Sequence, residues 1–273
     1  RMIYMLIDFH THAFPDKLVP KAISKLEAIG GIKSYGDGSV KNLLSHMSDA
    51  GVDRSVVLNI ATNAHQQSSV NSFAIETGQT QPNLYTLGSL HPDSENIAEE
   101  AKRLADAGIR GIKLHPDYIN TFIDDPKLDP IYEVCVEYDF FVVSHSGWDF
   151  ISPDCIHCTP ERILNVLKKF PTLRFVAAHM GANRQWDDVE RLLVGKNVWI
   201  DTSLAVPFGM ADEQFRRILT NHLPDHILFG SDYPWFTPED TYRRIIGLGL
   251  PNELLEGIFY KNALALLGDD TNK

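Results

Sequence analysis

The chain has 273 residues, of which 44% are hydrophobic and 22% charged, so its composition is that of an ordinary globular protein and excludes a disordered one. Its formal charge of -11 at pH 7 is spread along the sequence without a basic stripe, which argues against nucleic-acid binding. No apolar run reaches the roughly 20 residues of a membrane-spanning helix, and three cysteines argue against a disulfide framework. We expect a cytoplasmic protein that binds neither nucleic acid nor membranes.

The first predicted strand, Ile3 to Phe9, leads directly into two histidines, His10 and His12. Alternate residues of an extended chain point to the same face, so both imidazoles can reach one cation from one side. The connection that follows, residues 13–54, is longer than one helix needs and contains the glycine-containing stretch 30–38. We expect this segment to form a flap or insertion over a site.

Seven further apolar runs follow at intervals that leave room for helices. They are Ser55 to Ile60, Leu84 to Leu90, Gly111 to Leu114, Phe140 to Ser144, Arg174 to Ala178, Val198 to Ser203 and Ile227 to Gly230. Strands that alternate with helices predict repeated βαβ units and a parallel sheet. Eight strands, and no glycine-rich loop after the first, favour a closed barrel over an open sheet. The predicted fold is an α/β (β/α)8 barrel, with residues 1–273 as a single domain.

Several helices carry sequence signals for their ends. Thr159-Pro160 and Thr237-Pro238 each place a threonine N-cap before a proline at the first helical position. Between the third and fourth strands, Ala101 and Leu104 belong to an apolar stripe at helical spacing that ends at Gly108. This stripe predicts core packing only.

Polar residues with metal-binding chemistry close most of the predicted strands. These residues are His10, His12, His91, His115, His145, His179 and Asp232, whereas His46, His65, His157, His222 and His226 fall on predicted helices or loops. A barrel places the carboxyl ends of its strands on one rim, where barrel enzymes hold their active sites. Placed together, the strand-end residues would form a metal site.

Five strand-end motifs occur in order along nearly the whole chain: Asp8-Phe9-His10-Thr11-His12, Lys113-Leu114-His115-Pro116, Ser144-His145-Ser146-Gly147, Ala178-His179-Met180-Gly181 and Gly230-Ser231-Asp232-Tyr233-Pro234. They resemble the motifs of the amidohydrolase superfamily. The similarity is greatest to its amidohydrolase-related TIM-barrel branch, which includes aminocarboxymuconate semialdehyde decarboxylase.

The resemblance implies that His10, His12, His145 and Asp232 bind one divalent metal ion, and that Asp232 and His179 are catalytic. Imidazole nitrogens with one carboxylate suit Zn²⁺ best, while Mn²⁺, Fe²⁺ and Co²⁺ fit the same ligands. Metal-bound water ionises near neutral pH, so we expect a hydrolase of an amide, lactone or ester bond in a small anionic molecule. The alternative is a non-oxidative decarboxylase of a small aromatic or unsaturated acid. Related barrels often dimerise, so a homodimer is one of the oligomeric states that the sequence leaves open.

Lys113 and His115 lie two residues apart and share a face of the fourth strand. We interpret them as binding an anionic group of the substrate. In binuclear relatives a lysine of this strand is carbamylated and bridges two metal ions, which is the alternative role for Lys113.

Three further residues near the predicted rim are candidates for substrate binding. Trp148 and Trp235 follow His145 and Asp232 closely and would wall a pocket, or pack between loops. Arg184 follows His179 and would clamp a carboxylate, or form a salt bridge with a neighbouring aspartate.

Cys155-Ile156-His157-Cys158 has the spacing of a metal or redox motif, but no second ligand pair accompanies it, so we predict no zinc site there. Cys135 is predicted to lie in the core. A binding protein that has kept the barrel but lost turnover is the rival from another class, although every ligand position is filled.

Overall fold

The computed structural model describes residues 4–269, and within them eight short strands form a parallel barrel. The strands are β1 (Ile7–Thr11), β2 (Arg54–Leu58), β3 (Leu84–Leu87), β4 (Gly111–Leu114), β5 (Phe141–Ser144), β6 (Phe175–Ala177), β7 (Trp199–Asp201) and β8 (Ile227–Leu228). All eight predicted strands are confirmed. Most are shorter than predicted because the chain turns away into loops as soon as the barrel rim is reached. Ile3, the first residue of the predicted first strand, lies outside the described residues.

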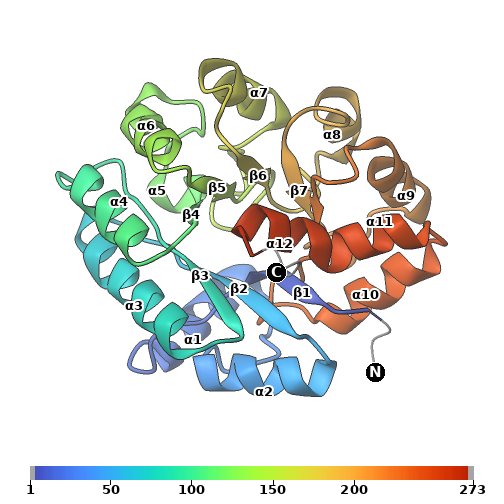
Figure 1. Ribbon diagram of the computed structural model, residues 1–273, viewed down its shortest axis with the longest axis horizontal. Coiled ribbons are helices and arrows are strands. Elements are labelled where there is room, and N and C mark those ends of the chain that lie inside the picture. The colour runs from blue at the N-terminus through green and yellow to red at the C-terminus, as the bar shows by residue number, and fades with distance from the viewer. Residues whose placement is uncertain (1–3, 270–273) are drawn as a thin grey trace.

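Helices surround the strands on the outside of the barrel (Figure 1). They are α1 (Val19–Gly30), α2 (Val40–Ala50), α3 (Gln67–Thr80), α4 (Ile97–Asp106), α5 (Pro116–Ile119), α6 (Asp129–Glu137), α7 (Pro160–Lys169), α8 (Trp186–Leu192), α9 (Asp212–Asn221), α10 (Pro238–Gly247), α11 (Asn252–Glu256) and α12 (Asn262–Leu267), with a π-helical turn over Gly257–Lys261 and 3₁₀ turns at Ala64–Gln66 and Pro126–Leu128. None of the helices within residues 4–269 has both the length and the apolarity to span a membrane.

Hydrogen bonds between strand ends close the barrel at two seams. Regular ladders join β1-β2-β3 and β4 through β8. Between β3 and β4, the Gly88 nitrogen donates to the Gly111 carbonyl at 3.1 Å. Between β8 and β1, the Phe9 nitrogen donates to the Phe229 carbonyl at 2.8 Å and the Asp232 nitrogen to the His10 carbonyl at 2.8 Å. The predicted closed (β/α)8 barrel is therefore confirmed, as a single domain.

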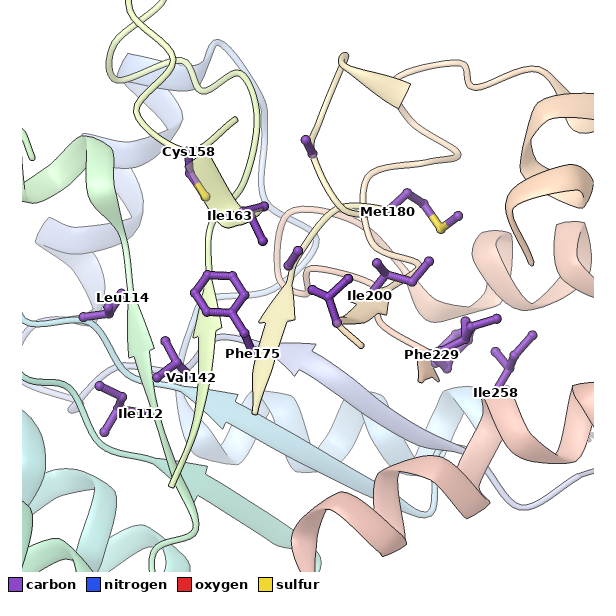
Figure 2. Close-up of a cluster of buried hydrophobic side chains, with 14 of the residues drawn as sticks. Ile112, Leu114, Val142, Cys158, Ile163, Phe175, Met180, Ile200, Phe229 and Ile258 are labelled. Atoms are coloured by element: carbon purple, nitrogen blue, oxygen red, sulfur yellow. The ribbon is translucent and has the colours of Figure 1, made fainter. Parts of the chain in front are cut away.

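Side chains alternate between two apolar layers, as the period of a strand requires. Phe9, Val143 and Val176 belong to the cluster inside the barrel, while Val142 and Phe175 belong to the larger cluster between strands and helices. Figure 2 shows part of this outer layer. Because both strand faces are buried, the strands are apolar at consecutive positions.

The C-terminal helix covers the amino-terminal end of the barrel. Leu264, Leu266 and Leu267 of the segment Asn262–Leu267 belong to the same cluster as the interior strand residues, and α12 crosses the strands in Figure 1. Arg54, at the start of β2, forms an ion pair with Asp269 just beyond α12. This end is therefore closed, and the opposite rim remains open for a site.

The helix starts agree with the sequence prediction, although one cap differs. The Thr159 side chain accepts a hydrogen bond from the Arg162 nitrogen, as an N-cap does. Thr237 also precedes its helix, but its side chain makes no cap bond and instead contacts the Asp240 carboxylate at 3.3 Å. The Thr237 hydroxyl thus donates to a carboxylate one turn along and accepts no backbone hydrogen bond.

Phe175→Ala is expected to destabilise the protein by about 3–5 kcal/mol, because Phe175 is fully buried between β6 and the helices and alanine would leave a cavity. Urea unfolding would measure the change, with an unchanged dependence on denaturant concentration. Val136→Ala, at an exposed position, serves as the control. A loss below about 1 kcal/mol would show that the layer collapses around the smaller side chain.

Candidate metal centre and active site

A pocket of about 580 Å³ opens at the carboxyl ends of the strands. Its lining includes the predicted site residues His10, His12, Lys113, His115, His145, Trp148, His179, Asp232 and Trp235. The closed amino end and the open carboxyl rim thus bring together residues that lie far apart in sequence. This is the position where barrel enzymes hold their active sites.

The first cluster joins β1 with the segment after β8. His10 lies in β1, His12 follows it, and both direct Nε2 toward Asp232. The Oδ1 atom of Asp232 is 3.2 Å from His12 Nε2 and 3.4 Å from His10 Nε2. Three ligand atoms from two distant segments therefore converge on one point.

The outer nitrogen of each ring fixes its tautomer. His10 Nδ1 is 2.8 Å from Asp201 Oδ2, and His12 Nδ1 is 3.0 Å from the Leu58 carbonyl oxygen. Carboxylates and carbonyls only accept, so each Nδ1 carries the hydrogen and each Nε2 keeps a lone pair. Metal-binding histidines are held by outer hydrogen bonds in the same way.

The donor set fits a divalent cation. Both Nε2 atoms lie within 3.4 Å of the Asp232 Oδ1 atom, so in the neutral rings two lone pairs and a carboxylate oxygen are directed to one point, where a cation would stabilise them. Burial lowers the pKa of His10, which favours the neutral form that binds metal. His10, His12 and Asp232 are thus suited to hold a metal ion.

A hydrogen-bonded chain links this cluster to two more histidines. Ser203 donates its hydroxyl hydrogen to Asp201, and its oxygen lies 2.7 Å from His179 Nδ1. His179 Nδ1 therefore carries a hydrogen, which leaves Nε2 to accept from His145 Nδ1 at 2.9 Å. Burial, and then the neighbouring His145, hold the pKa of His179 well below its usual value. The chain sets the tautomers of both rings.

Asp201 is the shared acceptor of this network and was not among the residues that we predicted. Burial alone would raise its pKa, but the electrostatic interaction with His10 and the hydrogen bonds from His10 and Ser203 lower the pKa to about 2. Asp201 lies inside the predicted strand Val198 to Ser203 and ends the strand only in the structure, where β7 spans Trp199–Asp201, so strand-end position did not single it out.

A second cluster lies beside the first. His145 Nε2 is 3.4 Å from Asp149 Oδ2, and the His115 ring stacks on the His145 ring at 4.4 Å. These two histidines and Asp149, which sequence reasoning also missed, form a separate potential ligand group. In the structure, His145 is not grouped with His10, His12 and Asp232, so its role as their fourth ligand stays a prediction.

Lys113 is buried between these clusters. Its Nζ lies 3.5 Å from His10 Nε2, and burial lowers the pKa of the amine to about 8. A lysine that is still mostly protonated at neutral pH can pair with an anion, and its position suits the predicted substrate contact. Its bridging role in a binuclear site stays a prediction.

Unusual backbone geometry directs two of the side chains. His179 and Asp232 have φ angles of 63° and 71°, in the left-handed region that residues with a side chain seldom adopt. Such strain tends to be retained at functional sites. Gly230 permits the close approach of the chain beside β1, since a Cβ there would lie 2.9 Å from His10 Cβ.

The aromatic candidates lie where the sequence suggested, and Arg184 lies apart from the pocket lining. Trp148 and Trp235 both line the pocket. The exposed Arg184 guanidinium lies 3.9 Å from the centroid of the Trp148 ring and 4.8 Å from that of Phe208. No ion pair from Arg184 to an aspartate occurs within residues 4–269. Its role as a carboxylate clamp stays a prediction.

Two histidine motifs have structural roles. His91 does not line the pocket, contrary to its expected place in the metal site, because its Nδ1 accepts a hydrogen bond from the Asp93 nitrogen at 3.2 Å. His157 Nδ1 lies 3.0 Å from Asp117 Oδ1, and His157 Nε2 lies 3.9 Å from the Cys155 sulfur, so the histidine pairs with a carboxylate and contacts one of the cysteines around it.

We expect one of the three thiols to react rapidly with a disulfide reagent in the native protein. Cys155 is exposed, whereas Cys135 and Cys158 are buried, and burial raises the pKa of Cys158 to about 12. Titration of the native protein with this reagent at pH 8 should therefore release about one equivalent of the reagent's thiol quickly. The Cys155→Ser variant should release none. Rapid release of two or more would contradict the burial of the other two.

Comparison with known proteins identifies the family. The amidohydrolase family model matches residues 7–268, so the chain belongs to the amidohydrolase family, whose members are metal-dependent enzymes. None of the curated proteins matches the sequence.

Solved structures share the fold. An uncharacterised TIM-barrel protein from Bordetella bronchiseptica is 19% identical, with a TM-score of 0.74 over 97% of this chain and 99% of that one. The 5-carboxyvanillate decarboxylase of Novosphingobium aromaticivorans, crystallised with manganese and 4-hydroxy-3-methoxy-5-nitrobenzoic acid, is 16% identical, with a TM-score of 0.74 over 97% and 96% of the chains. The 2,6-dihydroxybenzoate decarboxylase from Rhizobium is 14% identical, with a TM-score of 0.70 over 97% and 99%.

Proposed function

We propose that this protein is a metal-dependent, non-oxidative decarboxylase of an aromatic or unsaturated carboxylic acid. The observation that carries the proposal is the combination, in one pocket, of the His10, His12 and Asp232 donors, the buried amine of Lys113 and a wall of aromatic side chains. Several similar solved structures are decarboxylases, which supports this alternative over the hydrolase that we favoured from sequence.

The pocket chemistry is suited to loss of CO2. Transfer of a carboxylate into apolar surroundings is unfavourable unless it is paired, and Lys113 is placed to pair with it. Departure of neutral CO2 leaves an electron pair that an unsaturated substrate can delocalise. Phe208, Trp148 and Trp235 line the same pocket and provide low-polarity contacts for such a ring.

The residues of the pocket would bind either the metal ion or the substrate. His10, His12 and Asp232, with His145 as the predicted fourth ligand, would hold the divalent ion, either Zn²⁺ or Mn²⁺. When bound, the ion supplies a positive charge that neutralises the acidic oxygens of the substrate. Lys113 and His115 would orient the substrate.

Proton delivery completes the reaction. The bond between the ring carbon and the carboxylate breaks, CO2 leaves, and the electron pair stays on the carbon, which then takes up a proton. We assign this delivery to Asp232, which lines the pocket and would first take up a proton from water, with His179 positioning the substrate beside it.

Decarboxylation in D2O provides the test. Purified protein with Zn²⁺ or Mn²⁺ is incubated with a panel of hydroxybenzoates, and CO2 is measured together with the product spectrum. The proposal predicts one CO2 per product and one deuterium on the vacated carbon, with Asp232→Asn inactive. Acid production from matched esters, lactones or amides without CO2 release would overturn it in favour of hydrolysis.

A further inference from the structure

Helix α1 (Val19–Gly30) exposes an apolar stripe toward the active-site pocket. The pocket is lined by Leu18, which directly precedes α1, and by Ala22, Leu26 and Ile29 within it. Spacings of three and four residues place them on one helical face. Ile23 is the one residue of α1 that is buried. The segment expected to form a flap thus turns apolar side chains toward the site rather than into the core.

This stripe is unusually exposed. Leu18 is 54% exposed and Ile29 is 41% exposed, and they are two of the four large hydrophobic side chains that are exposed within residues 4–269. Exposed apolar groups that line a pocket gain free energy when a ligand covers them. Their place in the same pocket as the histidines points to the substrate as that ligand.

The facing wall is aromatic. The Trp148 and Phe150 rings lie 4.7 Å apart, the Phe150 and Phe208 rings 5.8 Å, and the Phe208 and Phe236 rings 6.2 Å. All four residues line the pocket. The helix approaches this wall closely, since a Cβ on Gly30 would lie 3.9 Å from Phe150.

The pocket therefore has two chemically different regions. Buried histidines, Asp232 and Lys113 form its polar region, and the α1 stripe with the aromatic wall forms its apolar region. Its volume of about 580 Å³ falls within the range of about 300–1,000 Å³ that holds drug-sized ligands.

We propose that the substrate is an amphipathic acid, whose carboxylate-bearing head binds at the histidines and whose aliphatic or aryl substituent lies between α1 and the aromatic wall. The identity of the head group rests on the proposed function, whereas the apolar substituent rests on the pocket lining alone. Lys25, on the same helical face, can keep its charged end in water while its stem covers the substituent.

Binding of a homologous series tests this without turnover. The 4-alkylcyclohexanecarboxylates, from methyl to heptyl, lack the unsaturation that decarboxylation needs. Their dissociation constants can be read from tryptophan fluorescence of the metal-loaded protein, because Trp148 and Trp235 line the pocket. The constant is expected to fall about two- to fourfold per added CH2 until the substituent fills the apolar region. Independence from chain length would overturn the proposal.

Two matched tryptophan substitutions on α1 localise the effect. Ala22→Trp would fill the apolar region, so the heptyl acid should lose at least about tenfold in affinity while the methyl acid keeps its affinity. Ala28→Trp, at an exposed position outside the pocket, should change neither. Ile29 is already exposed to solvent, so Ile29→Asn should preserve the fold and weaken the binding of the heptyl acid only. Equal behaviour of Ala22→Trp and Ala28→Trp would refute the assignment.

Light scattering on the same samples distinguishes the substrate from a second copy of the chain as the group that covers the stripe. If a second copy of the chain covered the stripe, Ala22→Trp would change the oligomeric state and leave the chain-length series intact, which would overturn the proposal. If no acid is decarboxylated but the series behaves as expected, the proposed function fails and the amphipathic pocket stands.

Discussion

A variant in which His10 and His12 are both alanine is expected to purify without a stoichiometric metal ion and to lose at least about 1,000-fold in kcat/KM. Both Nε2 atoms lie within 3.4 Å of Asp232 Oδ1 and present lone pairs to a common point. Removing two of the three donors leaves one carboxylate, which cannot compete with water for a divalent cation. Elemental analysis and steady-state kinetics on the same preparation would measure both effects.

His65→Ala is the matched control, because His65 is exposed on the turn before α3 and contacts no member of the cluster. It should keep the metal content and activity of the parent. A double variant that retains a full equivalent of metal would show that the ion binds elsewhere, with the group of His115, His145 and Asp149 as the next candidate.

Asp201→Asn is expected to weaken metal binding by about 10- to 100-fold, although Asp201 does not face the ion. Its two oxygens accept from His10 and from Ser203. The amide oxygen of an asparagine can still accept from one of these two partners. Its amide nitrogen, which is a donor, would then face the other partner. If that donor meets His10 Nδ1, the ring must exchange its tautomer and lose the lone pair that it presents to the cluster. Competition with a coloured chelator would measure the affinity.

Two further variants distinguish a positioning role from general damage. Ser203→Ala leaves the bond from His10 to Asp201 intact, so it should keep the metal affinity within about twofold while slowing kcat through His179. Asp225→Asn alters another carboxylate that pairs with a histidine, at 2.7 Å on the surface, and should change neither quantity. Nitrogen NMR of the imidazoles reports the tautomers directly. Unchanged metal affinity in Asp201→Asn would disprove the positioning role.

The fold could be predicted because its physical signals are local. Runs such as Phe141–Ser144 are apolar at consecutive positions, and a strand buried on both faces requires this pattern. The ends of strands were predicted less well, since β8 stops at Leu228 where the chain bends toward β1. Closure by a few backbone hydrogen bonds at two seams depends on contacts between distant segments, and no local pattern encodes these contacts.

The candidate site could be predicted in part for the same reason. Strand-end position was enough to place His10, His12 and Asp232 together. It failed for His91, whose side chain turns to its own loop, and it gave no orientation for His145. The orientations of these two side chains depend on hydrogen bonds between groups that become neighbours only in the folded protein. The acceptor Asp201 was missed because its contribution is visible only through the residues it contacts.

The donors of the first cluster belong to opposite sides of the seam between β8 and β1. His10 and His12 come from β1 and the residue just beyond it, Asp232 from the segment after β8, and backbone bonds such as the one from the Asp232 nitrogen to the His10 carbonyl join the two. An ion bound by all three donors would cross-link the barrel where its first and last strands meet. Loading the ion would then raise the melting temperature in proportion to the logarithm of its concentration, so catalytic competence and resistance to heat would be gained or lost together.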